Sequence, residues 1–277
     1  MATPRIFSPV TDADLLAAAI DLSRHAGQAI MEIYQRDFDV EHKDDASPLT
    51  EADLASHRLI VDGLRALTPD IPVLSEESAD IAWDTRRRWS RYWLVDPLDG
   101  TREFVKRNGE FTVNIALIDG DASVMGVVQA PVTGDLYYAR TGQGAYRQTS
   151  RQAEPERIRV RAPASPLVVA GSRSHGSERQ RTLLARLGEH QLVPQGSSLK
   201  FCLIARGDAD LYLRAGPTSE WDTGAAQCVL EEAGGAVLRL DGTPLRYNTK
   251  DSLLNPEFIA VGDASQPWAE RLDAASA

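Results

Sequence analysis

The hydrophobic residues near the N-terminus follow a helical period. Over residues 15–33 apolar side chains recur every three or four positions, which is the spacing of one buried helix face. This helix is predicted to begin at Thr11, because an acid, Asp14, follows three residues later as in a capping box. After a polar break, a second helix is predicted to begin near Thr50 and to end before Pro69.

Short β-rich segments dominate the next part of the chain. Gly, Pro and Asp turns separate them, and no long helical pattern lies between them. We therefore expect consecutive strands in an antiparallel sheet. The segments are residues 71–75, 92–96, 112–119, 123–131 and 135–140.

The pattern changes after a polar stretch over residues 147–157. Strand-like and helix-like segments then alternate, which predicts an α/β sheet. We place a boundary in this stretch, so that residues 1–150 form an N-terminal α+β half and residues 151–277 a C-terminal α/β half. The acidic pair Glu231-Glu232 is interpreted as part of a solvated helix face. The alternating segments are residues 167–172, 177–188, 190–195, 198–207, 210–216, 220–235 and 236–240.

Composition and charge argue against some classes of binding partner. The 277 residues are 43% hydrophobic and 25% charged, as in ordinary globular proteins. The net charge of -10 argues against a nucleic-acid polymer or an anionic membrane surface as partner, but a small phosphorylated ligand needs only a local positive field. Cys202 and Cys228 are expected to be reduced core thiols. With no secretory signal pattern and no run of ~20 apolar residues, we expect a cytoplasmic protein.

One strand-like segment ends in two acids. An apolar run leads directly into "DPLDGT", which begins at Asp96. A simple turn is one interpretation, since Asp-Pro and Asp-Gly are both turn dipeptides. The other is a site: the strand delivers Asp96 to its end, Pro97 fixes the chain direction, and Asp99 turns back toward the same point. Gly100-Thr101 then exposes backbone N–H groups suited to an oxyanion or phosphate.

Two carboxylates held close together repel each other unless a cation neutralises them. Hard divalent cations such as Mg²⁺ suit this role. Glu76 follows another short strand in "LSEESAD", and Asp222 lies in the first turn of a predicted helix in "SEWDTGAAQ". Singly, Glu76 could be a solvated loop acid and Asp222 a helix-capping acid. Their occurrence together with "DPLDGT", in this order, favours a metal site.

Three segments resemble the signature segments of the inositol-monophosphatase-like superfamily of Mg²⁺-dependent, Li⁺-sensitive phosphomonoesterases. They are "SEES", "WLVDPLDGT" and "EWDTGAAQCVLEEAGG". Within the superfamily the chain is most similar to the bacterial 3'(2'),5'-bisphosphate nucleotidases. These remove the 3'-phosphate from 3'-phosphoadenosine 5'-phosphate, a by-product of sulfate assimilation. The resemblance covers nearly the whole chain and implies a layered α/β/α/β/α sandwich, with the site where the two halves meet.

The resemblance also implies a ligand set. Glu76, Asp96, Asp99 and Asp222 would be the metal ligands, with Asp96 bridging two ions and the backbone carbonyl of Leu98 as a further ligand. Two or three Mg²⁺ ions are implied, with Mn²⁺ as a substitute and Li⁺ as an inhibitor.

The resemblance implies a catalytic pair as well. Asp53, in "SPLTEAD", would pair with Thr101 to orient the attacking water, and Glu76 could accept a proton from it. From the residues alone, Asp53 is equally well explained as the acid of the second helix's capping box. The two roles are compatible.

Segments similar to "GSRSH", "GSSLKF" and "DLYLRAG" surround the adenosine and its 5'-phosphate in the bisphosphate nucleotidases. By this resemblance Lys200 and Arg214 would hold the second phosphate. Taken singly, a His at a strand end is more often structural, and a Lys or Arg at an element end is more often solvated. The residues implied for substrate binding are Asp99, Gly100, Thr101, Ser174, His175, Ser197, Lys200, Arg214 and Asp222.

The expected activity is hydrolysis of 3'-phosphoadenosine 5'-phosphate to AMP and phosphate. The alternative enzyme is a phosphatase acting on inositol 1-phosphate or fructose 1,6-bisphosphate. A non-catalytic, metal-dependent binding module is disfavoured, because no expected ligand and neither member of the water-orienting pair is missing. The expected partner is a small phosphorylated molecule, and a homodimer is left open.

Overall fold

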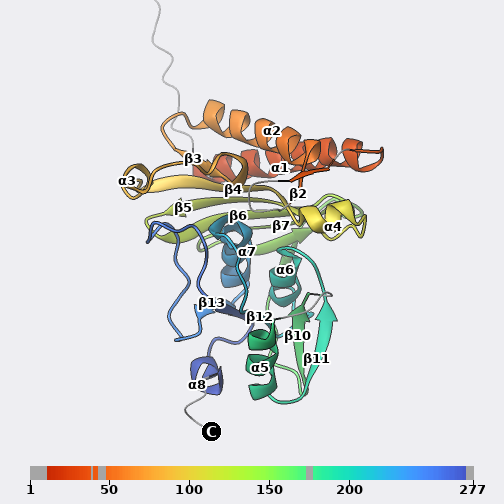
Figure 1. Cartoon of the computed structure of the whole chain (residues 1–277), viewed down its shortest axis with the longest axis vertical. Helices are drawn as coiled ribbons and strands as arrows, with labels where there is room; N and C mark the ends of the chain where they lie inside the picture. The colour runs from red at the N-terminus through yellow and green to blue at the C-terminus, as the bar shows by residue number, and fades with distance from the viewer. Residues whose placement is uncertain (1–10, 39, 43–47, 173–176, 273–277) are drawn as a thin grey trace, which may run out of the picture.

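Two long helices cover one face of a large sheet (Figure 1). The computed structural model describes residues 11–38, 40–42, 48–172 and 177–272. Helix α1 spans Asp12–Tyr34 and helix α2 spans Glu51–Leu67. The predicted capping boxes at Thr11 and Thr50 are both present, so each helix start is satisfied by its own side chains.

The large sheet has seven strands in the order β3-β4-β5-β6-β7-β8-β9. Neighbours run antiparallel, as predicted, except that β3 and β4 are parallel. Strands β8 and β9 were not predicted, and β9 begins inside the polar stretch expected to divide the chain. The division near residue 150 stays a prediction. The strands are β3 Val73–Ser75, β4 Arg91–Asp99, β5 Thr112–Asp119, β6 Ala122–Ala130, β7 Asp135–Arg140, β8 Gly144–Gln148 and β9 Glu156–Ile158.

A second sheet has five strands in the order β11-β10-β12-β14-β13. Strand β10 runs parallel to β11 and β12, whereas β14 runs antiparallel to β12 and β13. The alternating pattern correctly predicts β10 to β13 and the helices between them, but β14 and the short helix α8 were not predicted. The elements are β10 Leu167–Gly171, α5 Glu178–Arg186, β11 His190–Pro194, α6 Leu199–Ala205, β12 Leu211–Arg214, α7 Glu220–Glu232, β13 Ala236–Arg239, β14 Phe258–Val261 and α8 Trp268–Leu272.

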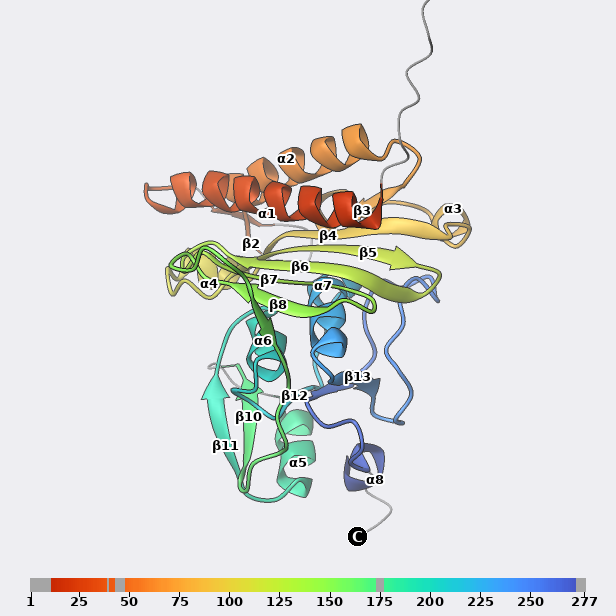
Figure 2. The same cartoon turned by 180° about the vertical axis from the view of Figure 1, so that it is seen from behind.

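Helices and sheets alternate in five layers (Figures 1 and 2). The pair α1 and α2 covers the seven-stranded sheet, α6 and α7 lie between the two sheets, and α5 and α8 cover the far face of the five-stranded sheet. Three hydrophobic clusters fill the space between the layers. The cluster around Trp93 lies between the α1–α2 pair and the large sheet, the one around Phe201 lies between the two sheets, and the one around Trp268 lies under α5 and α8. Stacking lets each helix bury its apolar face against a sheet. The predicted α/β/α/β/α sandwich is confirmed.

Shorter elements connect the layers. A hairpin of β1 and β2 precedes α2, and the 3₁₀ helix η1 follows β3 directly. Helix α4 follows β4 after one residue, so these two elements carry the "DPLDGT" segment. The elements are β1 Val40–His42, β2 Pro48–Thr50, η1 Glu76–Ser78, α3 Trp83–Arg86 and α4 Thr101–Val105.

Two smaller expectations have different outcomes. Cys202 and Cys228 are buried free thiols, as expected. Glu231 and Glu232 do not form a solvated helix face, because both are half-buried. The Glu232 carboxylate accepts hydrogen bonds from two N–H groups of the turn between β7 and β8. It ties α7 to a turn that is remote in sequence, and the local pattern carries no sign of such a contact.

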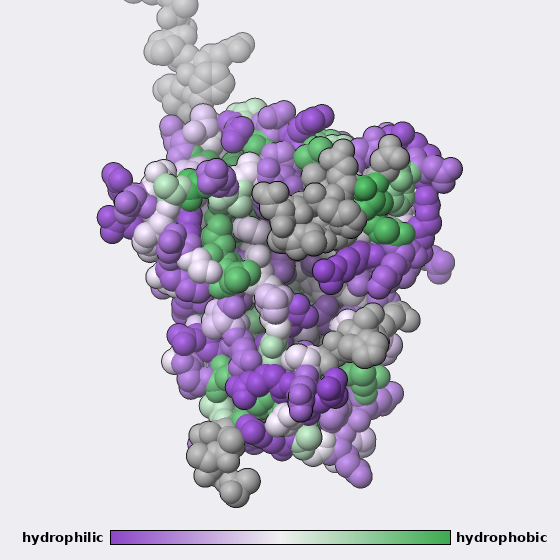
Figure 3. Space-filling model, viewed as in Figure 1, coloured by the Kyte–Doolittle hydropathy of each residue, from purple (hydrophilic) through white to green (hydrophobic). Residues whose placement is uncertain are grey.

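The outer surface is mainly polar. Hydrophilic side chains cover most of the face in Figure 3, and hydrophobic ones appear there only in small separate patches. Among the helices that the structure describes, none is both long and apolar enough to cross a bilayer.

Candidate active site

A bulge in β4 brings the two acids of "DPLDGT" together. Asp96 lies opposite Asn114 of the neighbouring strand β5. Asp99, three residues further on, lies opposite Thr112, which is only two residues away along β5. Such an extra residue is a β-bulge, which bends a strand and re-aims its side chains. Pro97 sits within it, where the missing N–H disturbs the ladder least.

Asp222 joins these acids from the second half of the chain. One carboxylate oxygen from each of Asp96, Asp99 and Asp222 lies within 4.8 Å of the other two. Asp222 stands in the first turn of α7. This helix can approach the large sheet closely because Gly126 of β6 has no side chain. A Cβ there would lie 2.1 Å from a carbonyl oxygen of α7.

Glu76 reaches the same acids through strand pairing. Strand β3 runs parallel to β4 in a register that places Glu76, the residue after β3, beside Asp96. The Glu76 carboxylate is close enough to raise the pKa of both Asp96 and Asp222. The four acids predicted as ligands therefore gather in one place.

This environment disfavours the charged form of the carboxylates. Burial is the largest cause that raises the pKa of Asp96, and the charges of its three acidic neighbours raise it further. Burial and the charge of Asp99 raise the pKa of Asp222 to about 8. A divalent cation would reverse this effect, because it stabilises ionised carboxylates. Hard oxygen donors gathered this closely fit Mg²⁺ or a similar ion.

Asp53 and Thr101 are in contact. The Thr101 hydroxyl donates a hydrogen bond to Asp53 Oδ1 over 3.1 Å. The other carboxylate oxygen of Asp53 accepts from the N–H and the hydroxyl of Thr50. Asp53 thus caps α2 and holds Thr101 at the same time. The Thr101 hydroxyl also lies 3.4 Å from the carbonyl oxygen of Leu98, the predicted backbone ligand.

Two serines that the sequence analysis missed form hydrogen bonds with the segment that carries the acids. The N–H of Ser198 donates to Asp99 Oδ2 over 2.7 Å, and its hydroxyl lies 2.8 Å from the same oxygen. The hydroxyl of Ser56, on α2, donates to the carbonyl oxygen of Pro97 over 2.7 Å. Ser198 directly precedes α6, and a serine at that position is a helix-start signal that could have found it. Ser56 has no such signal, because its partner lies 41 residues away.

Gly100 and Ser197 meet where α4 and α6 approach each other. Gly100 has a φ of 96°, a left-handed conformation that favours glycine, and a Cβ there would lie 2.5 Å from Ser197 Oγ. The Ser197 hydroxyl lies 2.7 Å from the carbonyl oxygen of Asp99 and 2.8 Å from that of Glu110. Ser197 therefore shapes the wall of the site, with its hydroxyl engaged by the backbone.

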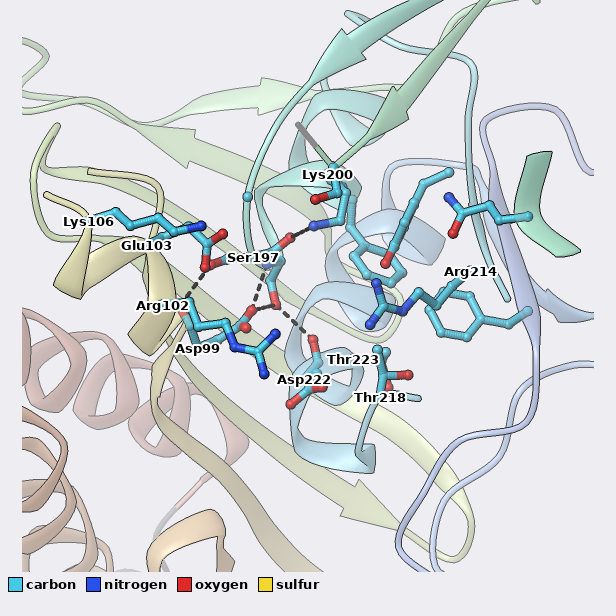
Figure 4. Close-up of a pocket in the computed structure, with 18 residues that line it drawn as sticks. Asp99, Arg102, Glu103, Lys106, Ser197, Lys200, Arg214, Thr218, Asp222 and Thr223 are labelled. Atoms are coloured by element: carbon cyan, nitrogen blue, oxygen red, sulfur yellow. Dashed lines mark hydrogen bonds between the residues drawn. The ribbon is translucent and has the colours of Figure 1, made fainter. Parts of the chain in front are cut away.

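A cavity of about 370 Å³ opens beside the acids (Figure 4). Its lining includes Asp99 and Asp222. It also includes cationic residues from three separate parts of the chain: α4 with its C-cap, α6, and the end of β12. Cations on walls next to a metal-binding cluster suit an anionic ligand. These cationic residues are Arg102, Lys106, Lys200 and Arg214.

The two cations predicted to hold a second phosphate already have partners. Lys200 is only 7% exposed, donates to the carbonyl oxygen of Ser197 over 2.7 Å, and lies over the ring of Tyr212. Burial lowers its pKa to about 8. Arg214 donates to two carbonyl oxygens of the loop that follows β12. Its guanidinium still points toward the cavity in Figure 4.

Ser174 and His175, predicted to line the nucleoside pocket, lie outside the described residues. Ser172, two residues before Ser174, lines the cavity. The strand that leads into "GSRSH" therefore ends at this site.

The fold and the acidic cluster define a class of phosphatases. The model described as "Inositol monophosphatase family" matches residues 12–271, nearly the whole chain. The chain therefore belongs to the inositol monophosphatase family and is a phosphatase. This confirms the resemblance found from the sequence.

Three individual proteins of the family show how similar this chain is to its relatives. The chain is 51% identical over 246 residues to the 3'(2'),5'-bisphosphate nucleotidase CysQ of Escherichia coli K12, covering 88% of this chain and 98% of that protein. It is 41% identical to the crystal structure of CysQ from Bacteroides thetaiotaomicron, with a TM-score of 0.79 over 90% of this chain and 97% of the other. The inositol monophosphatase of Thermotoga maritima has a TM-score of 0.75 at 25% identity, over 94% and 96%.

Proposed function

We propose that this chain is a Mg²⁺-dependent phosphomonoesterase that hydrolyses the 3'-phosphate of 3'-phosphoadenosine 5'-phosphate (PAP), producing AMP and phosphate. One observation carries the proposal. A cluster of acids, of which Asp96 is buried and the others are partly buried, lies with the Asp53–Thr101 pair beside a cavity whose walls carry four cationic residues. The name of the 51% identical relative, a bisphosphate nucleotidase, supports the choice of substrate.

The acids would hold the metal. Glu76, Asp96, Asp99, Asp222 and the carbonyl oxygen of Leu98 would bind two or three Mg²⁺ ions, with Mn²⁺ as a substitute and Li⁺ as an inhibitor. When bound, the ions supply positive charge that acidifies the attacking water and stabilises the charge of the transition state.

The chain's own side chains would orient that water. Because the Thr101 hydroxyl donates its hydrogen to Asp53, its oxygen is left to accept a hydrogen from the water. This arrangement would turn a lone pair of the water toward phosphorus. Glu76, beside Asp96, is the candidate to accept the second proton. The bond from phosphorus to the 3' oxygen would then break, and that oxygen would take up a proton from solvent water.

The walls of the cavity would bind the rest of the substrate. Lys200 and Arg214, which the sequence resemblance predicts to hold the second phosphate, add positive charge on the side formed by α6 and β12. Ser174, His175 and Ser197 stay predictions for the nucleoside pocket. A substrate with two phosphates suits one cavity that combines a metal-binding cluster with separate cations.

The test is phosphate release from PAP, inositol 1-phosphate and fructose 1,6-bisphosphate with Mg²⁺. We expect the highest kcat/KM for PAP, loss of activity with a chelator, recovery with Mg²⁺ or Mn²⁺, and inhibition by millimolar Li⁺. The Asp96→Asn variant, purified in the same way, controls for contaminating phosphatases. A higher kcat/KM for either of the other substrates would contradict the proposed substrate and favour the alternative enzyme.

A further inference from the structure

Two cations, Arg102 on α4 and Lys106 at the C-cap of this helix, line the cavity on one side. Arg102 and Lys106 both line it, and both are exposed. Within the described part of the chain, neither side chain has a hydrogen bond or an ion pair. Figure 4 shows the Arg102 side chain directed into the cavity, with Lys106 on the same side. Lys200 and Arg214, on the opposite side, instead donate hydrogen bonds to backbone carbonyl oxygens.

The local structure presents these two cations together. The N–H of Lys106 donates to the carbonyl oxygen of Arg102 over 3.0 Å, so the two residues lie one helical turn apart on the same face. On the inner side of α4, the buried Phe104 packs against the rings of Tyr34 and Phe111. This aromatic contact fixes the orientation of the short helix, so the cationic face stays turned toward the cavity.

The arrangement has an electrostatic cost in the absence of an anion. Like charges one turn apart on a helix repel each other. Glu103 lies between them in sequence and also lines the cavity, but it forms no ion pair with either side chain within the described residues. An anionic group bound between Arg102 and Lys106 would remove the repulsion and gain charge-assisted hydrogen bonds.

We propose that Arg102 and Lys106 bind the second phosphate of a bisphosphorylated substrate, the phosphate that is not hydrolysed. This rests on the proposed function. The phosphate that reacts must lie at the acids, near Thr101, whereas Lys106, the residue that caps the end of α4, stands about 7.5 Å further along the helix axis, at about 1.5 Å per residue. Lys200 donates hydrogen bonds to two backbone carbonyl oxygens of the turn before α6, so fewer of its three donors remain for a phosphate.

The experiment compares two substrates that differ by one phosphate. PAP carries both phosphates, and 3'-AMP carries only the one that reacts. For Lys106→Met and for Arg102→Met we expect KM for PAP to rise about 10-fold with kcat little changed. For 3'-AMP we expect KM and kcat close to those of the wild type. Arg58→Met is the matched control, because Arg58 is exposed on α2 and does not line the cavity.

Salt provides a second readout. Exposed charges are screened by ions, so KM of the wild type for PAP should rise with ionic strength more steeply than KM of either variant. The melting temperatures of the variants should equal that of the wild type or lie slightly above it, because a repulsion has been removed. A folding defect therefore cannot imitate the expected result.

Three outcomes would overturn the inference. They are equal losses on PAP and 3'-AMP, an unchanged KM for PAP in both variants, and a salt dependence that the substitutions leave unaltered. Failure of the proposed function would look different, because the wild type itself would release no phosphate from PAP. In that case the same variants, assayed on fructose 1,6-bisphosphate, decide whether the α4 cations bind a second phosphate.

Discussion

The acids of the site and the cations of the α4 wall are built in opposite ways. Asp53 and Asp96 are each 1% exposed, and hydrogen bonds to backbone and side-chain groups hold both. Arg102 and Lys106 are exposed, without side-chain partners among the described residues. Buried groups in a polar network rearrange only at a large cost, whereas exposed side chains reorient freely. The core thus sets the geometry of the reaction, and the surface supplies charge for binding. Substitutions among the acids should therefore act on kcat, and substitutions of the cations on KM.

The largest effect should come from Asp96→Asn. Because this acid is central to the cluster, its loss should lower kcat by at least about 10³-fold, the scale of several kcal/mol of metal-dependent stabilisation. Mg²⁺ binds the folded state, so the variant should also lose most of the rise in melting temperature that Mg²⁺ causes in the wild type. Initial rates and thermal melts with and without Mg²⁺ measure both.

The matched control is Asp62→Asn, the same chemical change at an exposed position of α2. It should leave the rate and the Mg²⁺-dependent shift unchanged. If Asp96→Asn behaved like this control, the cluster would not be where the reaction takes place, and the comparison between the buried and exposed charges would lose its basis.

Thr101→Ala should lower kcat by about 10²-fold with little change in KM, because the hydroxyl acts on the attacking water. Asp53→Asn should have a similar effect on kcat, and the double variant should cost little more than either single one. Thr101→Ser, which keeps the hydroxyl, should recover most of the rate. Losses that multiply in the double variant would show that the two residues act separately.

Arg214→Ala should raise KM for PAP by less than the roughly 10-fold expected for Arg102→Met, because Arg214 lies on the opposite wall and already donates to two backbone carbonyl oxygens. Lys200→Met should change KM less, because its ammonium group is held by carbonyl oxygens, and it should lower the melting temperature more. The two variants therefore compare a half-buried cation, Arg214, with a buried one, Lys200. A larger KM effect for Lys200→Met, with an unchanged melting temperature, would mean that the buried lysine contacts the substrate.

The smallest predicted effect is the dependence of folding stability on pH in the absence of divalent cations. The pKa of Asp222 is about 8 in the folded chain and about 4 in an unfolded one, so the folded state binds more protons between these values. Stability without divalent cations should therefore fall as pH rises from 5 to 8, so the melting temperature should be lower at pH 8 than at pH 5.

Mg²⁺ should flatten this pH dependence, because a bound cation keeps the carboxylates ionised at every pH in the range. The Asp222→Asn variant should show a weaker dependence without Mg²⁺, since it lacks the titrating group. Thermal melts in chelator across the pH range make the measurement. If the melting temperature depended on pH in the same way in the wild type and in the variant, the raised pKa of Asp222 would be contradicted.

The sequence by itself determined the local elements and the kinds of residues in the site. Capping boxes join residues only three apart, and strand and helix periods repeat within a few positions, so both appear directly in the chain. "DPLDGT" lies on one segment, which made Asp96, Asp99 and Thr101 candidates before any fold was known. The resemblance to a family then linked these residues to Glu76, Asp53 and Asp222. Elements with short or weak patterns, such as β8, β9 and β14, were missed.

Only the tertiary structure decided which groups are free to act. The bulge in β4, the parallel pairing of β3 with β4, and the close approach of α7 at Gly126 depend on contacts between distant segments. Ser56 reaches Pro97 across 41 residues in the same way. In sequence, Lys200 and Lys106 look alike, each a lysine near the end of a short helix. Burial and two backbone carbonyl oxygens engage the first, whereas the second faces the cavity without a partner within the described residues, because packing and not composition sets the surroundings of a charge.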